Sequence, residues 1–269
     1  MDHPTQPRPG IQSVEVAASI LEALAEAPAA VPLKSLAAAA QMSPAKVHRY
    51  LVSLTRSGLV EQDPVTGYYG IGRLSLVLGL KALGRVDVVR LASDAMPGLR
   101  DRIDETVVLT VWGDGGPTIV RFEESRHPVT LNVRVGSVLP ILTTALGKVF
   151  AAFARSPQIG DALTKEWRRS AGGKSALSKT ALDRTLDEVR QRGLARIAGD
   201  QLPGVSALAA PIFDHLGDVA GAIGALGRQE SFDIDWDGKI AIAVRETASR
   251  VSSQMGFVTE LGSSPSHSD

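Results

Sequence analysis

The spacing of hydrophobic residues at the start of the chain predicts two helices. Apolar side chains recur every three or four positions over residues 14–24, with Ser13 as a candidate N-cap and an end near Ala27. Ser35 is a candidate N-cap for a second, short apolar helix. Residues 1–10, rich in proline, are expected to be a disordered arm.

A third helix is predicted over residues 44–57, where Ser43 suits the N-cap, Pro44 the first turn and Gly58 the end. A strand, a turn over residues 63–67 and a second strand over 68–71 follow, which is the order of a winged helix-turn-helix. The inward positions of this helix are Val47, Tyr50 or Leu51, and Leu54, and the outward ones are Ala45, Lys46, His48, Arg49 and Ser53.

Residues 74–83 form an apolar helical stretch between Gly72 and Gly84, which is typical of a linker helix between domains. A further helix is predicted over residues 88–103, although Pro97 and Gly98 are expected to kink or break it.

The hydrophobic period changes to two beyond this point, which indicates a sheet with helices packed on it, and therefore an α+β domain. The expected domains are a winged helix-turn-helix at 11–72, a linker helix at 73–86, a larger α+β domain at 87–258 and a disordered tail at 259–269. The predicted elements are a hairpin over 106–125, strands over 129–142, 206–214 and 218–227, helices over 143–154, 181–193 and 236–256, and a loop over 168–178.

The composition is that of an ordinary globular protein, with 44% hydrophobic and 22% charged residues among 269. The absence of cysteine excludes disulfides and thiolate metal sites, and no apolar run is long enough to span a membrane. We expect a cytoplasmic protein without a membrane anchor. The five histidines have no metal-ligand spacing, and nothing in the sequence indicates a cofactor.

Patterns that resemble enzyme motifs are incomplete. The segment 171–177 lacks the first glycine of a phosphate-binding loop, and the Ser43–Lys46 spacing has no companion motif. Gly221, Gly224 and Gly227 depart from the dinucleotide fingerprint and favour a close backbone approach instead. An enzyme with an accessory helical domain is therefore the weaker interpretation.

Local charge favours a nucleic-acid interface at the third helix. Basic and acidic residues number 29 each, so the formal net charge is zero, yet residues 41–58 contain three cations and no carboxylate. Arginine and lysine suit guanine edges and phosphates, whereas a solvated surface role is the alternative for each residue. The candidate DNA contacts are Ser43, Ala45, Lys46, His48, Arg49, Ser53, Arg56 and, on the wing, Tyr68.

The segment from Met42 to Gly72 resembles the DNA-binding half of the IclR family of transcriptional regulators. Residues 133–153, with a Gly-Lys pair, and the two late strands are similar to its sensor domain. The resemblance implies a GAF-like effector domain, a homodimer or homotetramer, a palindromic double-stranded DNA operator and a small organic acid as effector. A sensor that acts by protein contact alone is the remaining alternative.

By the same resemblance, the effector cavity lies between the Gly-Lys segment and the late strands. Ala207, Gly224 and Leu226 stand where relatives carry polar anchors, and Leu142 replaces a common histidine, which favours a largely apolar or aromatic acid. Helix-start amides are suitable anion donors. Trp112 has a purely structural role in the core as its alternative, and Arg121 has a surface charge as its alternative. The candidate effector contacts are Val108, Thr110, Trp112, Leu142, Thr143, Thr144, Ala145, Leu146, Ala207, Gly224 and Leu226, with Ile119 and Arg121 as further candidates.

Overall fold

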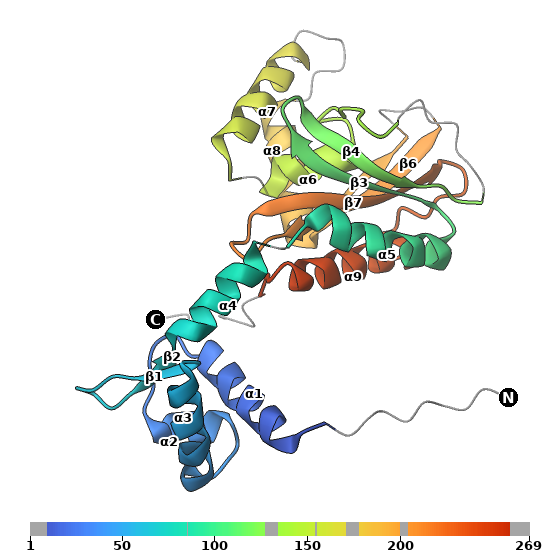
Figure 1. Cartoon of the computed structure of the whole chain (residues 1–269). Helices are drawn as coiled ribbons and strands as arrows, with labels where there is room; N and C mark the ends of the chain where they lie inside the picture. The colour runs from blue at the N-terminus through green and yellow to red at the C-terminus, as the bar shows by residue number, and fades with distance from the viewer. Residues whose placement is uncertain are drawn as a thin grey trace, which may run out of the picture. The chain divides into compact units, whose positions relative to one another are not determined.

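The computed structural model describes residues 10–84, 86–126, 134–153, 155–170, 178–199 and 204–258. The chain divides into two compact units, residues 1–85 and 86–269. The first is mainly helical, and the second is built on a five-stranded sheet (Figure 1). The α+β class expected from the sequence is confirmed. The division lies within the predicted linker, whereas most of the predicted arm and the whole tail lie outside the described residues.

Three helices, a two-stranded hairpin and a fourth helix after the hairpin are described in the N-terminal unit, and the hairpin projects away from the first three helices (Figure 1). The core of the unit is made by one apolar face of each of the first three helices together with Val60 and Tyr69 from the hairpin. The elements are α1 (Gln12–Ala25), α2 (Leu33–Ala39), α3 (Pro44–Ser57), β1 (Val60–Gln62), β2 (Tyr69–Ile71) and α4 (Arg73–Leu83).

Only one of the three predicted N-caps is correct. Ser43 caps α3, whereas α1 begins before Ser13 because the Ile11 carbonyl already accepts from Val14 N at 2.9 Å. Helix α2 begins before Ser35 because Val31 pairs with β2 and the chain turns into the helix directly after Pro32. Tertiary pairing has overridden the local capping preference at this position.

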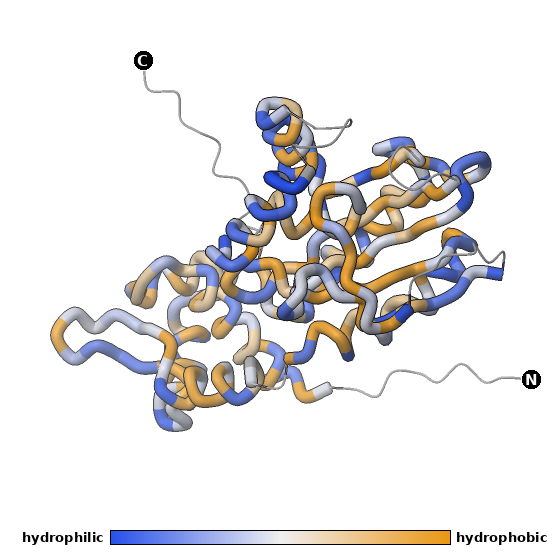
Figure 2. The backbone as a smooth tube through the Cα atoms, turned by 90° about the horizontal axis from the view of Figure 1, so that it is seen from above, coloured by the Kyte–Doolittle hydropathy of each residue, from blue (hydrophilic) through white to orange (hydrophobic). Residues whose placement is uncertain are grey.

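The C-terminal unit is one antiparallel sheet in the order β4-β3-β7-β6-β5, with helices on both faces (Figure 1). Helices α5 and α9 pack on one face, and α6 and α8 pack on the other. The strands are hydrophobic over much of their length, whereas several turns are hydrophilic (Figure 2). The elements are α5 (Val88–Ile103), β3 (Thr106–Gly113), β4 (Gly116–Glu123), α6 (Ala145–Phe153), α7 (Pro157–Ser170), α8 (Lys179–Arg192), β5 (Ala195–Ala198), β6 (Val205–Phe213), β7 (Val219–Arg228) and α9 (Lys239–Gln254).

Several sequence predictions need correction in this unit. Helix α5 continues through Pro97 because Met96, Leu99 and Ile103 are buried against the sheet and hold it in place. The predicted strand over 129–142 lies partly outside the described residues, and its remainder contains only an isolated bridge at Val138. Helix α7 occupies the start of the predicted loop, and neither α7 nor β5 was expected.

Candidate DNA-binding surface and effector cavity

Helix α3 is fixed at both ends and along one face. The Ser43 hydroxyl accepts a hydrogen bond from Lys46 N at 3.4 Å, and Gly58 ends the helix with a φ of +77°, in the left-handed region that favours glycine. Val47, Leu51 and Leu54 are buried in the core of the unit. The opposite face of the helix is therefore held rigidly toward solvent.

That outward face contains the predicted DNA contacts. Ala45, Arg49, Ser53 and Arg56 follow one another at helical spacing and are exposed, as is His48, while Lys46 is half-buried. None of the three cations forms an ion pair with any residue that the structure describes. Their charges are available for an external anion.

The turn of the β1–β2 hairpin is held by hydrogen bonds from its backbone to the Asp63 side chain. The Asp63 carboxylate accepts hydrogen bonds from Val65 N at 2.7 Å and Thr66 N at 2.9 Å. The bonds from Thr66 and Val65 hold the pKa of this carboxyl below its usual value of 3.8. The hairpin, residues 60–71, carries Glu61 and Asp63 but no cation. Tyr68 is exposed beside β2, where it is free to reach a partner.

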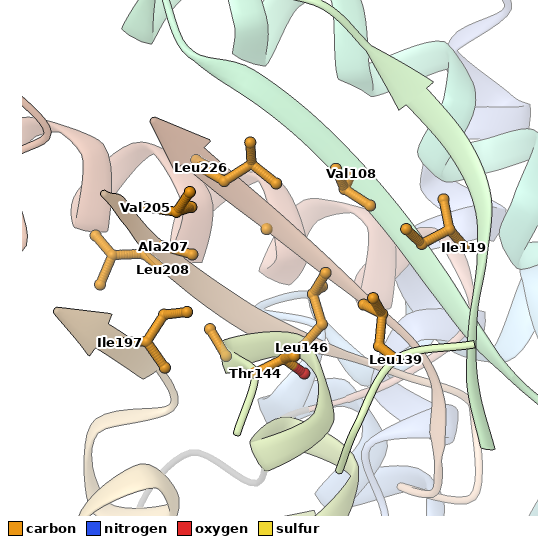
Figure 3. A pocket seen from close by; sticks show the side chains of 13 residues that line it. Val108, Ile119, Leu139, Thr144, Leu146, Ile197, Val205, Ala207, Leu208 and Leu226 are labelled. Atoms are coloured by element: carbon orange, nitrogen blue, oxygen red, sulfur yellow. The ribbon is translucent and has the colours of Figure 1, made fainter. Parts of the chain in front are cut away.

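A small cavity of about 60 Å³ lies between the sheet and the start of α6. Side chains from β3, β4, β6 and β7 face Leu139, Leu146 and Thr144 across it, and the labelled side chains are carbon apart from the Thr144 hydroxyl (Figure 3). Seven predicted effector contacts line this cavity, namely Val108, Thr144, Ala145, Leu146, Ala207, Gly224 and Leu226, together with Ile119.

The other four predicted contacts lie elsewhere. Thr110 is buried and donates to Ala222 O at 3.3 Å, and Leu142 is buried without lining the cavity. Trp112 contacts the Phe150 ring at 5.6 Å and lines an outer cleft, and Thr143 lines a neighbouring groove. Arg121 donates to Ser93 Oγ of α5 at 3.1 Å, on the opposite face of the sheet.

Five residues that line the cavity were not predicted from the sequence, because the elements that carry some of them were not predicted correctly. Ile197 belongs to β5, a four-residue strand whose alternating buried positions are a weak but readable signal. Leu139 lies in a segment that was expected to be a strand. The missed residues are Leu139, Ile197, Val205, Leu208 and Ala225.

The segment before α6 is held by side chains on both sides. The Thr144 hydroxyl donates to Pro140 O at 2.7 Å and accepts from Gly147 N at 2.9 Å, so it acts as a cap. A β-carbon at Gly147 would lie 2.3 Å from Pro140 O, so this close turn requires glycine. The Glu166 carboxylate of α7 accepts from Ile141 N at 2.9 Å and Leu142 N at 3.0 Å.

These bonds leave two backbone donors of the helix start without a partner in the part of the chain that the structure describes. The amides of Ala145 and Leu146, at the first two positions of α6, form no hydrogen bond within the described residues. Helix-start amides point along the helix axis and carry partial positive charge. They are the groups at this site best suited to an anion.

Comparison with known families decides the identity. A model of the IclR helix-turn-helix domain matches residues 13–64, and a model of the C-terminal domain of bacterial IclR transcriptional regulators matches residues 80–253. The chain belongs to the IclR family. The glycerol operon regulatory protein of Streptomyces griseus is 32% identical over 255 residues, which cover 91% of this chain and 97% of that protein.

Solved IclR-family structures share the fold. HmgR of Pseudomonas aeruginosa is 39% identical, with a TM-score of 0.84 over 92% of this chain and 99% of that one. The repressor BlcR of Agrobacterium tumefaciens, at 23% identity, has a TM-score of 0.76 over 93% and 99% of the two chains, which shows the fold alone. The family expected from the sequence is confirmed.

As an IclR-family chain, the protein is a transcriptional regulator. Two of its enzyme-like patterns have structural roles, and the third, residues 171–177, lies outside the described residues. Ser43 is a helix cap, and a β-carbon at Gly224 would lie 2.8 Å from Leu208 O, so this glycine allows the strands to pack closely. No helix within the described residues is long and apolar enough to cross a membrane. The same part of the chain contains no cluster of metal-ligating side chains.

Proposed function

We propose that this IclR-family regulator binds a palindromic operator as a homodimer or homotetramer in the cytoplasm and responds to a small, largely apolar or aromatic organic acid. Control of a catabolic operon is the expected outcome. The observation that carries the effector class is the cavity beside α6, whose side chains are all uncharged and nearly all apolar. A structural neighbour from Microbacterium hydrocarbonoxydans, an IclR homolog complexed with 4-hydroxybenzoate, shares the fold at 20% identity.

The DNA contacts are proposed on the outward face of α3. Arg49 lies at its centre, where a guanidinium reaches the two acceptors of a guanine, while Lys46 and Arg56 suit phosphates. Ser43, Ala45, His48 and Ser53 complete this face, and Tyr68 extends it to the wing.

An Arg49→Ala variant tests this interface. We expect it to lose operator binding in a gel-shift assay and to retain effector binding, because its side chain is exposed and supports no core contact. Arg90→Ala is the matched control, since Arg90 is an exposed arginine of α5 with only an i,i+4 partner. Unchanged operator affinity in the Arg49 variant would remove α3 from the interface.

Assembly is proposed through α4, whose apolar side chains are not covered. Leu76, Leu78 and Leu80 are 58%, 54% and 60% exposed, and Leu74 and Val77 are each 39% exposed. A run of large apolar side chains in solvent is a typical association surface. Sedimentation analysis of a Leu76→Glu variant is expected to show a smaller assembly than the native chain.

The cavity must widen to hold a ring. Its 60 Å³ corresponds to roughly two water molecules, whose share of liquid volume is about 30 Å³ each. Widening separates Leu139 and Leu146 from the strands, and it thereby moves the start of α6. We infer that the acid selects a minor, opened state, with its carboxylate at the Ala145 and Leu146 amides. The change is proposed to reach the DNA-binding unit through α4.

Calorimetry with a panel of acids tests the effector class. Aromatic monocarboxylates are expected to bind, and acids of two or three carbons are expected to bind far more weakly. An Ala207→Leu variant, which fills the cavity with an isobutyl group, is expected to lose the binding that takes place in this cavity. If only the small acids bound the native protein, the apolar cavity would not be the effector site.

A further inference from the structure

A second, larger cavity lies outside the one proposed for the effector. It has a volume of about 590 Å³ and lies between the β3–β4 turn and α7, and we term it the outer cleft. Ligand pockets usually have volumes of roughly 300–1,000 Å³. The outer cleft shares no lining residue with the inner cavity.

Two cations of α7 line the outer cleft. Lys165 and Arg169 are spaced four residues apart, so they lie on the same side of the helix, and both are exposed. Neither forms an ion pair or a hydrogen bond with a described residue. The neighbouring Arg168 is also exposed but does not line the cleft. Two adjacent cations on one wall suit a carboxylate.

The outer cleft also contains two carboxylates, Glu166 and Asp114. Glu166 lies between the two cations in sequence, but its carboxylate accepts from the amides of Ile141 and Leu142 and is thereby directed to the backbone. Asp114 lies in the β3–β4 turn on the facing wall. Its charge disfavours a ligand with several negative charges, so the cleft suits a monoanion.

The remaining walls suit a flat ring. Trp112 lines the cleft and also contacts Phe150 at 5.6 Å, so its indole is held in place. In the facing turn Gly115 is exposed, whereas Gly113 is half-buried and Gly116 is buried, so a ligand meets bare backbone mainly at Gly115. An aromatic ring packs favourably against a fixed indole and an uncovered peptide surface.

We propose that the outer cleft is a second ligand site, which binds a small aromatic monocarboxylate with its carboxylate at Lys165 and Arg169 and its ring against Trp112. The inference goes beyond the proposed effector cavity, because the two sites use different residues and opposite chemistry. The inner cavity has apolar walls beside the start of α6, whereas the outer cleft offers cations in contact with solvent.

The test uses the full chain and 4-hydroxybenzoate as the probe, in calorimetry and in titrations of tryptophan fluorescence. In an Ala207→Leu background, which blocks the inner cavity, we expect binding to persist at one site. Adding Lys165→Gln and Arg169→Gln is expected to lower the association constant of that site at least roughly tenfold, because charge-assisted bonds are lost. Arg168→Gln is the matched control and should leave that association constant unchanged.

The outcomes separate the two sites. No binding in the Ala207→Leu background would overturn the outer cleft and leave the inner cavity as the binding site. Binding in that background that the double substitution does not weaken would also overturn the outer cleft. Binding that survives Ala207→Leu undiminished and disappears with the double substitution would support the outer cleft and refute the inner cavity. Leu226→Phe also fills the inner cavity. The same result in this variant shows that a folding defect of Ala207→Leu is not the cause.

Discussion

Replacing Glu166 with alanine is expected to destabilise the C-terminal unit by about 2–4 kcal/mol, because it leaves two buried backbone amides without a hydrogen-bond acceptor. The Glu166 carboxylate accepts from Ile141 N and Leu142 N at 2.9 and 3.0 Å, and these residues are only 4% and 3% exposed. A buried donor without an acceptor costs about 1–3 kcal/mol. We take the lower part of that range for each amide, since Glu166 itself is half-buried and water can enter in its place.

Two further variants calibrate that value. Glu166→Gln keeps one acceptor oxygen, so we expect about half the loss, roughly 1–2 kcal/mol. Glu188→Ala removes a surface carboxylate that pairs with Arg192 at 3.6 Å, and it should cost no more than about 0.5 kcal/mol.

Urea denaturation followed by tryptophan fluorescence is a suitable assay for these variants. The three tryptophans, Trp112, Trp167 and Trp236, all lie in the C-terminal unit, so the signal reports on that unit alone. Amide hydrogen exchange at residues 141 and 142 should also become faster in Glu166→Ala. Equal stability of the Glu166→Ala and Glu188→Ala variants, with unchanged exchange, would refute the reasoning.

Two other predictions concern the wing and the strands. Because the pKa of Asp63 is lowered, its carboxylate stabilises the wing turn fully above about pH 3.8, and this stabilisation is lost as the pH falls through the folded-state pKa. An NMR titration of the carboxyl measures that pKa, and a value at or above 3.8 would contradict the prediction. Gly224→Ala should cost about 1–3 kcal/mol and weaken effector binding, because its β-carbon would lie 2.8 Å from Leu208 O. Gly79→Ala in α4, with nothing within 4 Å, is the control and should not destabilise the chain.

Local signals predicted the DNA-binding unit well where two of them agreed. At α3 the cap Ser43, Pro44 and Gly58 mark the same helix, and Val47 and Leu54 are buried as expected. At α2 the single serine Ser35 was misleading, because the bridge between Val31 and β2 decides where that helix starts. Such a pairing between distant segments leaves no trace in local spacing.

The C-terminal unit was predicted less completely, for two different reasons. Helix α7 has a readable signal, since Ile159, Leu163 and Trp167 recur every four residues after Pro157, and it was overlooked beside the glycine-rich segment that follows. The separation of Trp112 and Thr143 from the inner cavity has no such signal. It depends on how α7 and the segment before α6 pack in three dimensions.

The absence of cations from the wing has a consequence for how the regulator is distributed along a chromosome. Attraction to arbitrary DNA grows with the number of phosphates neutralised, and a hairpin carrying only Glu61 and Asp63 neutralises none by charge. Roughly 10⁶–10⁹ genomic sites compete with any one operator. A low background affinity keeps fewer molecules idle on that competing DNA. On the proposal that α3 contacts the bases, occupancy of the operator then depends mainly on those contacts.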